Sequence, residues 1–249
     1  MDLNTIYIVW LRDLIRYFRQ RSQLYGSILR PILWLFILGM GLRPSFRTIA
    51  GFNYTQFIFP GIIAMALIFT SIQSAISIIW DREFGFLKEL LVAPVPRTAI
   101  ALGKAFAGST LAVIQGSIIL IFSLFVKVPL TWYKILALLP AMFLISFALT
   151  NIGIIIAARM TSFEGFGTIM NFIIMPMFFL SGAMFPIAGL PKTLKLVMLI
   201  NPLTYGVDLL RKIILEVSAL PLITSLGFLL TFSLGALLLA IFFFNQGEY

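Results

Sequence analysis

Long apolar stretches dominate the chain, and short polar or charged segments separate them. Six stretches reach the length of about 20 apolar residues that is needed to cross about 30 Å of hydrocarbon. They lack the two-residue alternation of a barrel strand, and a helix satisfies its own backbone hydrogen bonds in lipid. We therefore predict an all-α polytopic membrane protein with six spans, at residues 24–42, 56–79, 105–126, 135–157, 166–185 and 222–244.

Residues 1–22 precede the first span and follow a different pattern. An apolar face is expected from Trp10, Leu11, Leu14, Tyr17 and Phe18, and another face carries Arg12, Arg16 and Arg19. This pattern predicts an amphipathic helix at the membrane interface, with its arginines among the lipid headgroups. The chain is accordingly divided into an interfacial helix at residues 1–22 and a membrane domain at residues 23–246.

Two connections are too long to be simple turns. Residues 83–91 interleave charged side chains with Phe and Leu and end before Pro94, which predicts a short amphipathic helix. That helix is compatible with two roles, a peg for a partner protein or a solvated helix at the headgroup boundary. Residues 186–221 are divided by prolines into two short helices, at 192–200 and 203–217, each too short and too charged to span.

Composition excludes several classes of function. The chain is 61% apolar and 11% charged, against about 45–50% and about 25% in soluble domains. It contains no Cys and no His, which excludes thiolate nucleophiles, cysteine zinc sites and His-dependent catalysis or metal binding. No P-loop string is present. The formal net charge of +9 indicates basic loops beside anionic headgroups rather than nucleic-acid binding.

The positions of the charges bear on mechanism and orientation. All acidic residues lie outside the predicted spans, whereas ion-driven carriers place carboxylates at membrane depth. Six helices without a motor or such carboxylates form an incomplete pump; a self-sufficient channel or secondary carrier is the alternative. Five arginines from Arg12 to Arg30 precede the first crossing, so we expect both termini to be cytoplasmic. Arg30 is interpreted as snorkelling to the interface beside Pro31.

Two motifs at matching places in this topology resemble the ABC-2-type exporter permeases. The first, between the second and third spans, reads WDREFGFLKELLVAPVPRTAIALGKA, and the second, between the fifth and sixth, reads PMFFLSGAMFPIAGLP followed by INPLTYGVDLLR. The resemblance covers essentially the whole chain. The strings LSGAMFP and NPLT are most similar to the drug and lipo-oligosaccharide exporter branch.

The resemblance implies a transport subunit without enzymatic activity of its own. Two permeases, expected to be a homodimer, would pair with two separate ATP-binding subunits that hold ATP and Mg²⁺, and no cofactor is expected in this chain. The helix between the second and third spans would be the coupling helix, seated in a cleft of the ATP-binding subunit. The residues implied are Arg82, Glu83, Gly85, Leu87, Lys88, Leu90 and Leu91, with a second, smaller contact at Arg159 and Glu164.

Residues within and beside the spans are candidates for the transport path. The amides expected to line it are Gln73, Gln115, Asn151 and Asn171, with hydrogen bonding between helices as the alternative. An external apolar gate is expected from Phe178, Phe179, Gly182, Phe185 and Pro186, with aromatic anchoring at the interface as the alternative. With 25 Phe and few polar groups, the path suits an amphipathic or lipid-like substrate such as a drug, lipid or lipid-linked glycan.

Overall fold

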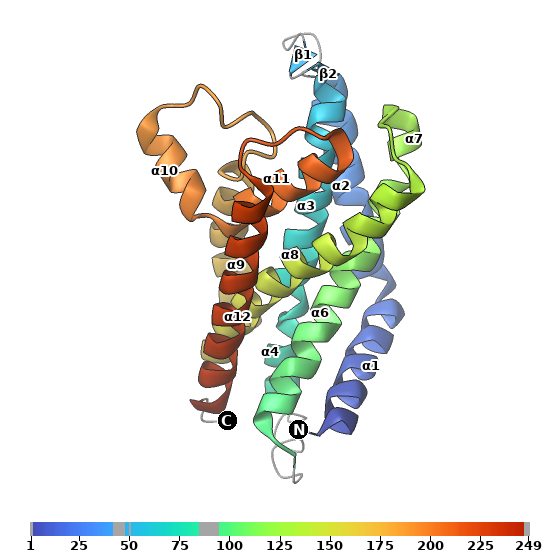
Figure 1. Cartoon of the computed structure of the whole chain (residues 1–249). Helices are drawn as coiled ribbons and strands as arrows, with labels where there is room; N and C mark the ends of the chain where they lie inside the picture. Colours follow the sequence, from blue (N-terminus) through green and yellow to red (C-terminus); the bar gives the residue numbers. More distant parts are fainter. Residues whose placement is uncertain (1, 42–47, 50, 85–94, 247–249) are drawn as a thin grey trace.

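The computed structural model describes residues 2–41, 48–49, 51–84 and 95–246, which form a bundle of long helices with one small hairpin (Figure 1). The elements are α1 (Leu3–Arg19), α2 (Arg21–Gly41), β1 (Thr48–Ile49), β2 (Phe52–Asn53), α3 (Tyr54–Ser74), α4 (Ile76–Glu83), α6 (Arg97–Leu120), α7 (Ser123–Val126), α8 (Trp132–Arg159), α9 (Phe163–Phe179), α10 (Lys192–Ile200), α11 (Pro202–Leu215) and α12 (Leu222–Gln246). The two strands pair antiparallel, with Thr48 opposite Asn53.

The all-α polytopic fold is confirmed. Within the described residues, five helical segments are long and apolar enough to cross a membrane: Gln23–Gly41, Tyr54–Glu83, Arg97–Leu120, Trp132–Arg159 and Leu222–Gln246. The fifth predicted span corresponds to α9, an apolar helix of 17 residues. The two predicted short helices are α10 and α11, which meet at 89° and together would make a sixth, broken span.

Several helix boundaries differ from those predicted; α6, for example, ends at Leu120 rather than at 126. The helical segment of α3 and α4 continues to Glu83, and α6 begins at Arg97 rather than at 105, so Asp81 and Lys104 lie inside helices. The expectation that the spans contain no carboxylate is therefore wrong for Asp81 and Glu83, which both lie in the segment Tyr54–Glu83. Helix α9 ends at Phe179 rather than at 185, because the backbone turns at Gly182, whose φ of +73° favours glycine.

The centre of the bundle is formed by α3, α6 and α8. Helix α3 is buried almost continuously from Phe57 to Ile72. At Gly108 of α6, an added Cβ would lie 2.2 Å from Ser74 Oγ and 2.6 Å from Thr150 Cγ2, which belong to α3 and α8. Small residues let helix backbones approach closely where lipid supplies no hydrophobic driving force between helices. Glycine at this position therefore allows the three helices to meet.

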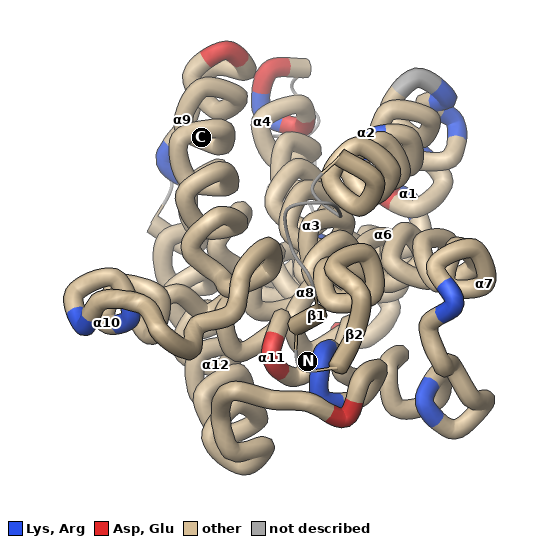
Figure 2. Tube along the Cα trace, turned by 90° about the horizontal axis from the view of Figure 1, so that it is seen from above, with Lys and Arg blue, Asp and Glu red and all other residues tan. Residues whose placement is uncertain are grey.

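The two ends of the bundle differ in their elements. Both termini, the end of α4 and the start of α6 lie at one end, and the hairpin, α7, α10 and α11 lie toward the other (Figure 1). Viewed along the bundle, the long helices are mostly uncharged and the charged residues gather at their ends and in the connections (Figure 2). This is the distribution expected when the helices lie in lipid and their ends meet water.

Helix α1 packs along α6 and runs in the same direction. Trp10 Nε1 donates to Thr110 Oγ1 at 3.1 Å, and Gln115 Nε2 donates to Tyr17 Oη at 2.9 Å. Of the face predicted to be apolar, Tyr17 is buried, and Leu11 and Phe18 are exposed. The residues that α1 buries recur every four positions: Thr5, Val9, Asp13 and Tyr17. Asp13 belongs to this face because it has ionic partners on α6.

Candidate functional site

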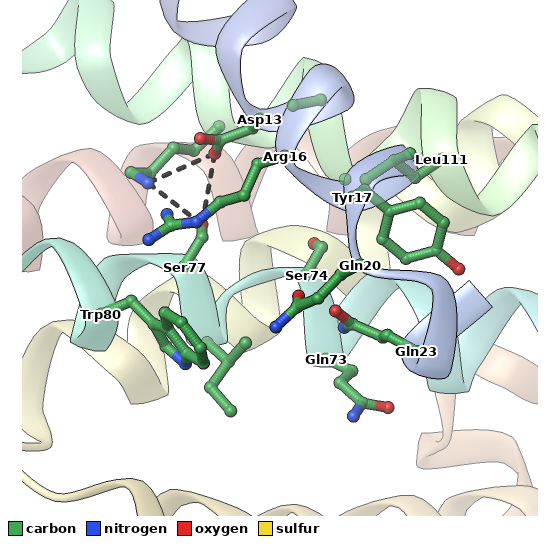
Figure 3. A pocket seen from close by; sticks show the side chains of 14 residues that line it. Asp13, Arg16, Tyr17, Gln20, Gln23, Gln73, Ser74, Ser77, Trp80 and Leu111 are labelled. Atoms are coloured by element: carbon green, nitrogen blue, oxygen red, sulfur yellow. Dashed lines mark hydrogen bonds and ion pairs between the residues drawn. The ribbon is translucent and has the colours of Figure 1, made fainter. Parts of the chain in front are cut away.

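A buried cluster of charged side chains joins α1, α4 and α6 at the end of the bundle that holds both termini. Lys104 Nζ of α6 lies 2.7 Å from Asp81 Oδ2 of α4 and 3.3 Å from Asp13 Oδ2 of α1. It also donates to Ser77 Oγ at 3.0 Å, and Ser77 donates to Asp13 at 3.2 Å (Figure 3). Lys104 and Asp81 are each 2% exposed and Asp13 is 7% exposed.

Two arginines of α1 complete this ion cluster. Arg12 Nη2 lies 2.6 Å from Asp81 Oδ2 and 2.8 Å from Asp13 Oδ1, and Arg16 Nη1 lies 3.0 Å from Asp81 Oδ1. The Arg16 guanidinium also lies over the Trp80 ring, 5.2 Å from its centroid. Burial alone would lower the pKa of Arg12, but the carboxylates of Asp13 and Asp81 outweigh it and raise that pKa. The two carboxylates therefore hold Arg12 in its charged form.

The ion cluster fixes α1 to the two helices that flank residues 85–94. Asp81 lies four residues before that segment, and Lys104 lies ten residues after it. Buried charges are tolerated only when they are paired, and the loss of one partner typically costs about 3–5 kcal/mol. The helices on both sides of the segment are therefore held in place by the same buried ion pairs.

Arg82 links the end of α4 to the end of α8. Its guanidinium donates to the carbonyl of Ala158 at 3.1 Å and to the carbonyl of Met160. These carbonyls lie at a helix C-terminus, where a cation also interacts favourably with the helix dipole. Glu83, the last residue of α4, is exposed. The other residues predicted for the coupling helix, Gly85, Leu87, Lys88, Leu90 and Leu91, lie outside the described residues.

The second predicted coupling contact lies at the same end of the bundle. Arg159, the last residue of α8, is exposed and its guanidinium lies 4.6 Å from the centroid of the Phe243 ring. Glu164 is exposed in the first turn of α9, whose N-cap Ser162 accepts a hydrogen bond from Gly165 N. Arg159 and Glu164 lie on either side of the connection between α8 and α9. Arg82 binds this connection directly, through the carbonyl of Met160.

The four amides predicted to line a path do not converge. Gln115 is buried and donates to Tyr17 Oη, a contact between helices. Asn151 donates at 2.8 Å to Phe147 O within α8. Gln73 and Asn171 are exposed on α3 and α9. Of the four, Gln73 lines two adjoining cavities near α1, and the other three are absent from the lining of both.

The residues predicted for an external gate lie where α9 ends. Phe178 is buried and contacts the half-exposed Phe179 edge to face, with ring centroids 5.6 Å apart. The buried carbonyl of Gly182 accepts a hydrogen bond from Arg211 Nη2 at 2.7 Å. Phe185 and Pro186 are half-buried beyond this turn. The region is thus a turn that packs against α11 through the hydrogen bond from Arg211.

Two residues that hold this turn were missed by the sequence analysis. Asn201 Nδ2 donates to Met177 O at 2.6 Å and to Leu180 O at 3.1 Å, while its Oδ1 caps α11 by accepting from Leu203 N. Arg211 lies 4.1 Å from the centroid of the Phe57 ring. The Asn-Pro pair was a detectable helix-start signal, since Asn is a favoured N-cap and Pro a favoured first residue.

Comparison with known proteins finds similarity along most of the chain. The family model described as "ABC-2 type transporter" matches residues 4–215. Similar proteins include "Putative transport permease ycf38" of Cyanophora paradoxa, 31% identical over 84% of this chain and 73% of that protein. "Nodulation protein J" of Rhizobium leguminosarum bv. trifolii is 28% identical over 86% of this chain and 82% of that protein. "Inner membrane transport permease YadH" of Escherichia coli K12 is 26% identical over 90% and 88%.

Proposed function

This chain belongs to the ABC-2 type transporter family, and from that premise we propose that it is the permease subunit of an ATP-driven exporter. In this proposal it moves an amphipathic or lipid-like substrate across the cytoplasmic membrane and catalyses no reaction itself. Two copies of a separate ATP-binding subunit supply the energy by hydrolysing ATP with Mg²⁺. A second permease, an identical copy, completes the transporter, with both termini of each permease in the cytoplasm.

The ion cluster is the observation that best supports the coupling role. A coupling segment can transmit a movement to the membrane helices only if the helices that hold it do not deform. Closely packed helices meet this requirement, because they move as rigid bodies. Asp81, Lys104 and Asp13 bind the two flanks of residues 85–94 to α1. A displacement of that segment by the ATP-binding subunit would therefore move α1, α4 and α6 together and, through them, the bundle.

Apolar surfaces support both the substrate class and the dimer. In the most apolar stretches of α2 and α12, only 17% and 22% of the residues are buried, although both helices are long enough to span the membrane. Exposed side chains on α2 include Leu33, Phe36 and Ile37. Such faces are stable against lipid or against a second apolar subunit. A path between two faces of this kind would favour an amphiphile over a sugar or an ion.

The test is reconstitution of the complex with its ATP-binding subunit in liposomes, followed by ATP hydrolysis and transport of candidate amphiphiles. We expect Glu83→Arg, at the exposed end of α4, to weaken association and to lower transport severalfold. Lys195→Glu is the matched charge reversal, exposed on α10 away from the termini, and is expected to leave association unchanged. If Glu83→Arg changes neither quantity, the coupling assignment is wrong. If the purified permease alone moves solute, a channel or secondary carrier replaces the exporter.

A further inference from the structure

A cavity lined by both apolar and polar side chains adjoins the ion cluster between α1, α3, α4 and α6 (Figure 3). Its volume is about 370 Å³. The polar side chains that line it include Arg16, Gln20, Gln23, Gln73, Ser74 and Ser77, and Trp80 forms an aromatic wall. Gln20 and Gln23 lie at the bend between α1 and α2, opposite Gln73 of α3. The cavity is therefore formed by one chain, where α1 meets α2.

A second, smaller cavity of about 210 Å³ adjoins the first. The two share Gln23 and Gln73 as lining residues, so the polar wall continues from one cavity into the other. Arg30 lines the second cavity, and its guanidinium lies 4.5 Å from the centroid of the Phe69 ring. Arg16 thus belongs to the lining of the first cavity and Arg30 to that of the second.

The glutamines around the cavities lack partners within the chain. The side-chain amides of Gln20, Gln23 and Gln73 make no hydrogen bond to any residue that the structure describes. Each amide carries two donors and an acceptor. Beside membrane-spanning helices, such groups require polar partners, because the hydrocarbon offers none. Three unpaired amides facing one space point to a ligand with several oxygen atoms.

The charges around the cavities favour an anion. Asp13 is the carboxylate in the lining, and both of its oxygens are already bound by Arg12, Ser77 and Lys104. The ion cluster contains three cations and two carboxylates, which leaves one positive charge in excess. Arg30 adds a second, since it forms no ion pair with a described residue. A singly charged anion beside the shared glutamines would offset one of these two charges.

We propose that the two cavities bind the headgroup of one anionic phospholipid. The phosphate lies near Gln23 and Gln73 in the second cavity, which Arg30 also lines, and the neighbouring headgroup oxygens bind the glutamine amides. Arginine is well suited to this role, because its planar fork of donors matches phosphate oxygens. The proposal does not depend on transport activity.

The acyl chains have a surface of their own beside the second cavity. Beside Arg30 and toward the end of the helix, α2 carries exposed apolar residues, which are Leu29, Leu33, Phe36, Ile37 and Met40. The cavities are too small for a complete diacyl lipid but have the size of a pocket for a compact polar group. The headgroup would therefore enter the chain while the acyl chains lie along α2 in the membrane.

The experiment is lipid binding to the full-length chain in detergent, followed by native mass spectrometry. We expect one phosphatidylglycerol per chain to be retained in preference to phosphatidylcholine. The double variant Gln23→Leu/Gln73→Leu is expected to weaken this binding about tenfold or more, since each lost hydrogen bond to a charged group is worth a severalfold change. Arg30→Gln is expected to weaken it several-fold, without altering the ion cluster.

Two control variants separate the cavity from general surface effects. Gln246→Leu removes an exposed amide on α12, and Arg19→Gln removes an exposed arginine on α1; neither residue lines either of these two cavities. Both are expected to bind phosphatidylglycerol like the parent chain. Size-exclusion profiles verify folding, and the single variant Gln73→Leu replaces the double variant if the latter does not fold.

Three results would overturn the proposal. The first is equal retention of phosphatidylglycerol and phosphatidylcholine by the parent chain. The second is unchanged binding in both Gln73→Leu and Arg30→Gln. The third is displacement of the lipid by glycerol 3-phosphate at equal concentration, which would show that the ligand is a soluble phosphate. Because no ATP-binding subunit is present, these results are independent of the test of the exporter function.

Discussion

Lys104 of α6 and Asp81 of α4 form an ion pair of 2.7 Å in which each side chain is 2% exposed. The two residues lie on either side of residues 85–94, which correspond to the coupling helix in the family resemblance. Asp13 and two arginines of α1 close the cluster around them. The geometry makes the stability of this end of the bundle depend on charge pairing between helices rather than on apolar contact alone.

Removal of the central cation should destabilise the chain. Lys104→Met leaves Asp81 and Asp13 without their shared partner, and we expect a loss of about 3–5 kcal/mol in the free energy of unfolding. Thermal unfolding in detergent measures the effect. Adding Asp13→Asn to Lys104→Met should recover part of the loss, because one uncompensated charge is removed with its partner. Lys195→Met, an exposed lysine on α10, is the control and should unfold like the parent. A Lys104→Met variant as stable as the parent would contradict the paired arrangement.

Contact between α1 and α6 should be sensitive to volume at Gly103. An added Cβ would lie 2.8 Å from Val9 Cβ and 3.0 Å from the carbonyl oxygen of Ile6. Gly103→Ala should therefore cost about 1–3 kcal/mol and increase proteolysis within α1. Gly235→Ala on α12, where an added Cβ meets nothing within 4 Å, should be neutral or stabilising by up to about 1 kcal/mol. Equal effects of the two substitutions would show that α1 does not pack closely on α6.

The two functions of Asn201 can be separated by substitution. Asn201→Ser keeps an oxygen that can cap α11, whereas Asn201→Asp keeps the cap but replaces the donor to Met177 O and Leu180 O by a second acceptor. We expect Asn201→Asp to be less stable than Asn201→Ser by at least about 1 kcal/mol at neutral pH. The difference should narrow in acid, since a protonated carboxyl can donate again. Thermal unfolding at several pH values tests this order, and a more stable Asn201→Asp would refute it.

Arg211 should not be replaceable by lysine. Its guanidinium both donates to Gly182 O at 2.7 Å and lies over the Phe57 ring, and a planar group is needed for both contacts. We expect Arg211→Lys and Arg211→Met to lower the free energy of unfolding by about 2 kcal/mol each. Lys212→Met, at the adjacent and more exposed position, should stay within about 0.5 kcal/mol of the parent. Full stability in Arg211→Lys would show that charge alone is required there.

Much of the fold could be predicted because lipid restricts the backbone conformations that a membrane-spanning segment can adopt. A backbone in lipid must bond to itself, so each long apolar run predicts a helix, and five of the six predicted spans correspond to helices long enough to cross. Asparagine and proline at residues 201 and 202 likewise indicated the start of α11 through local backbone chemistry. These features depend on residues that are close in sequence.

The ion cluster could not be predicted in the same way. Asp13 lies among arginines on α1, and its i, i+4 neighbours Val9 and Tyr17 gave no indication that the carboxylate shares their buried face. Lys104 and Asp81 fell just outside the predicted spans, because hydropathy ends a span at the first charge and does not register that a charge is paired. The three groups come from helices separated by as many as 91 residues.

The amino-acid sequence by itself determined the helical class, the approximate spans, the short helices between the fifth and sixth, and the family. The tertiary structure decided which charges meet, which face of α1 is buried, and where the glutamines of α1, α2 and α3 enclose a cavity. The physical reason is that lipid acts on each segment separately, through hydropathy and backbone hydrogen bonding. Ion pairing and cavity formation depend on distances of a few ångströms between segments, which only the packed helices define.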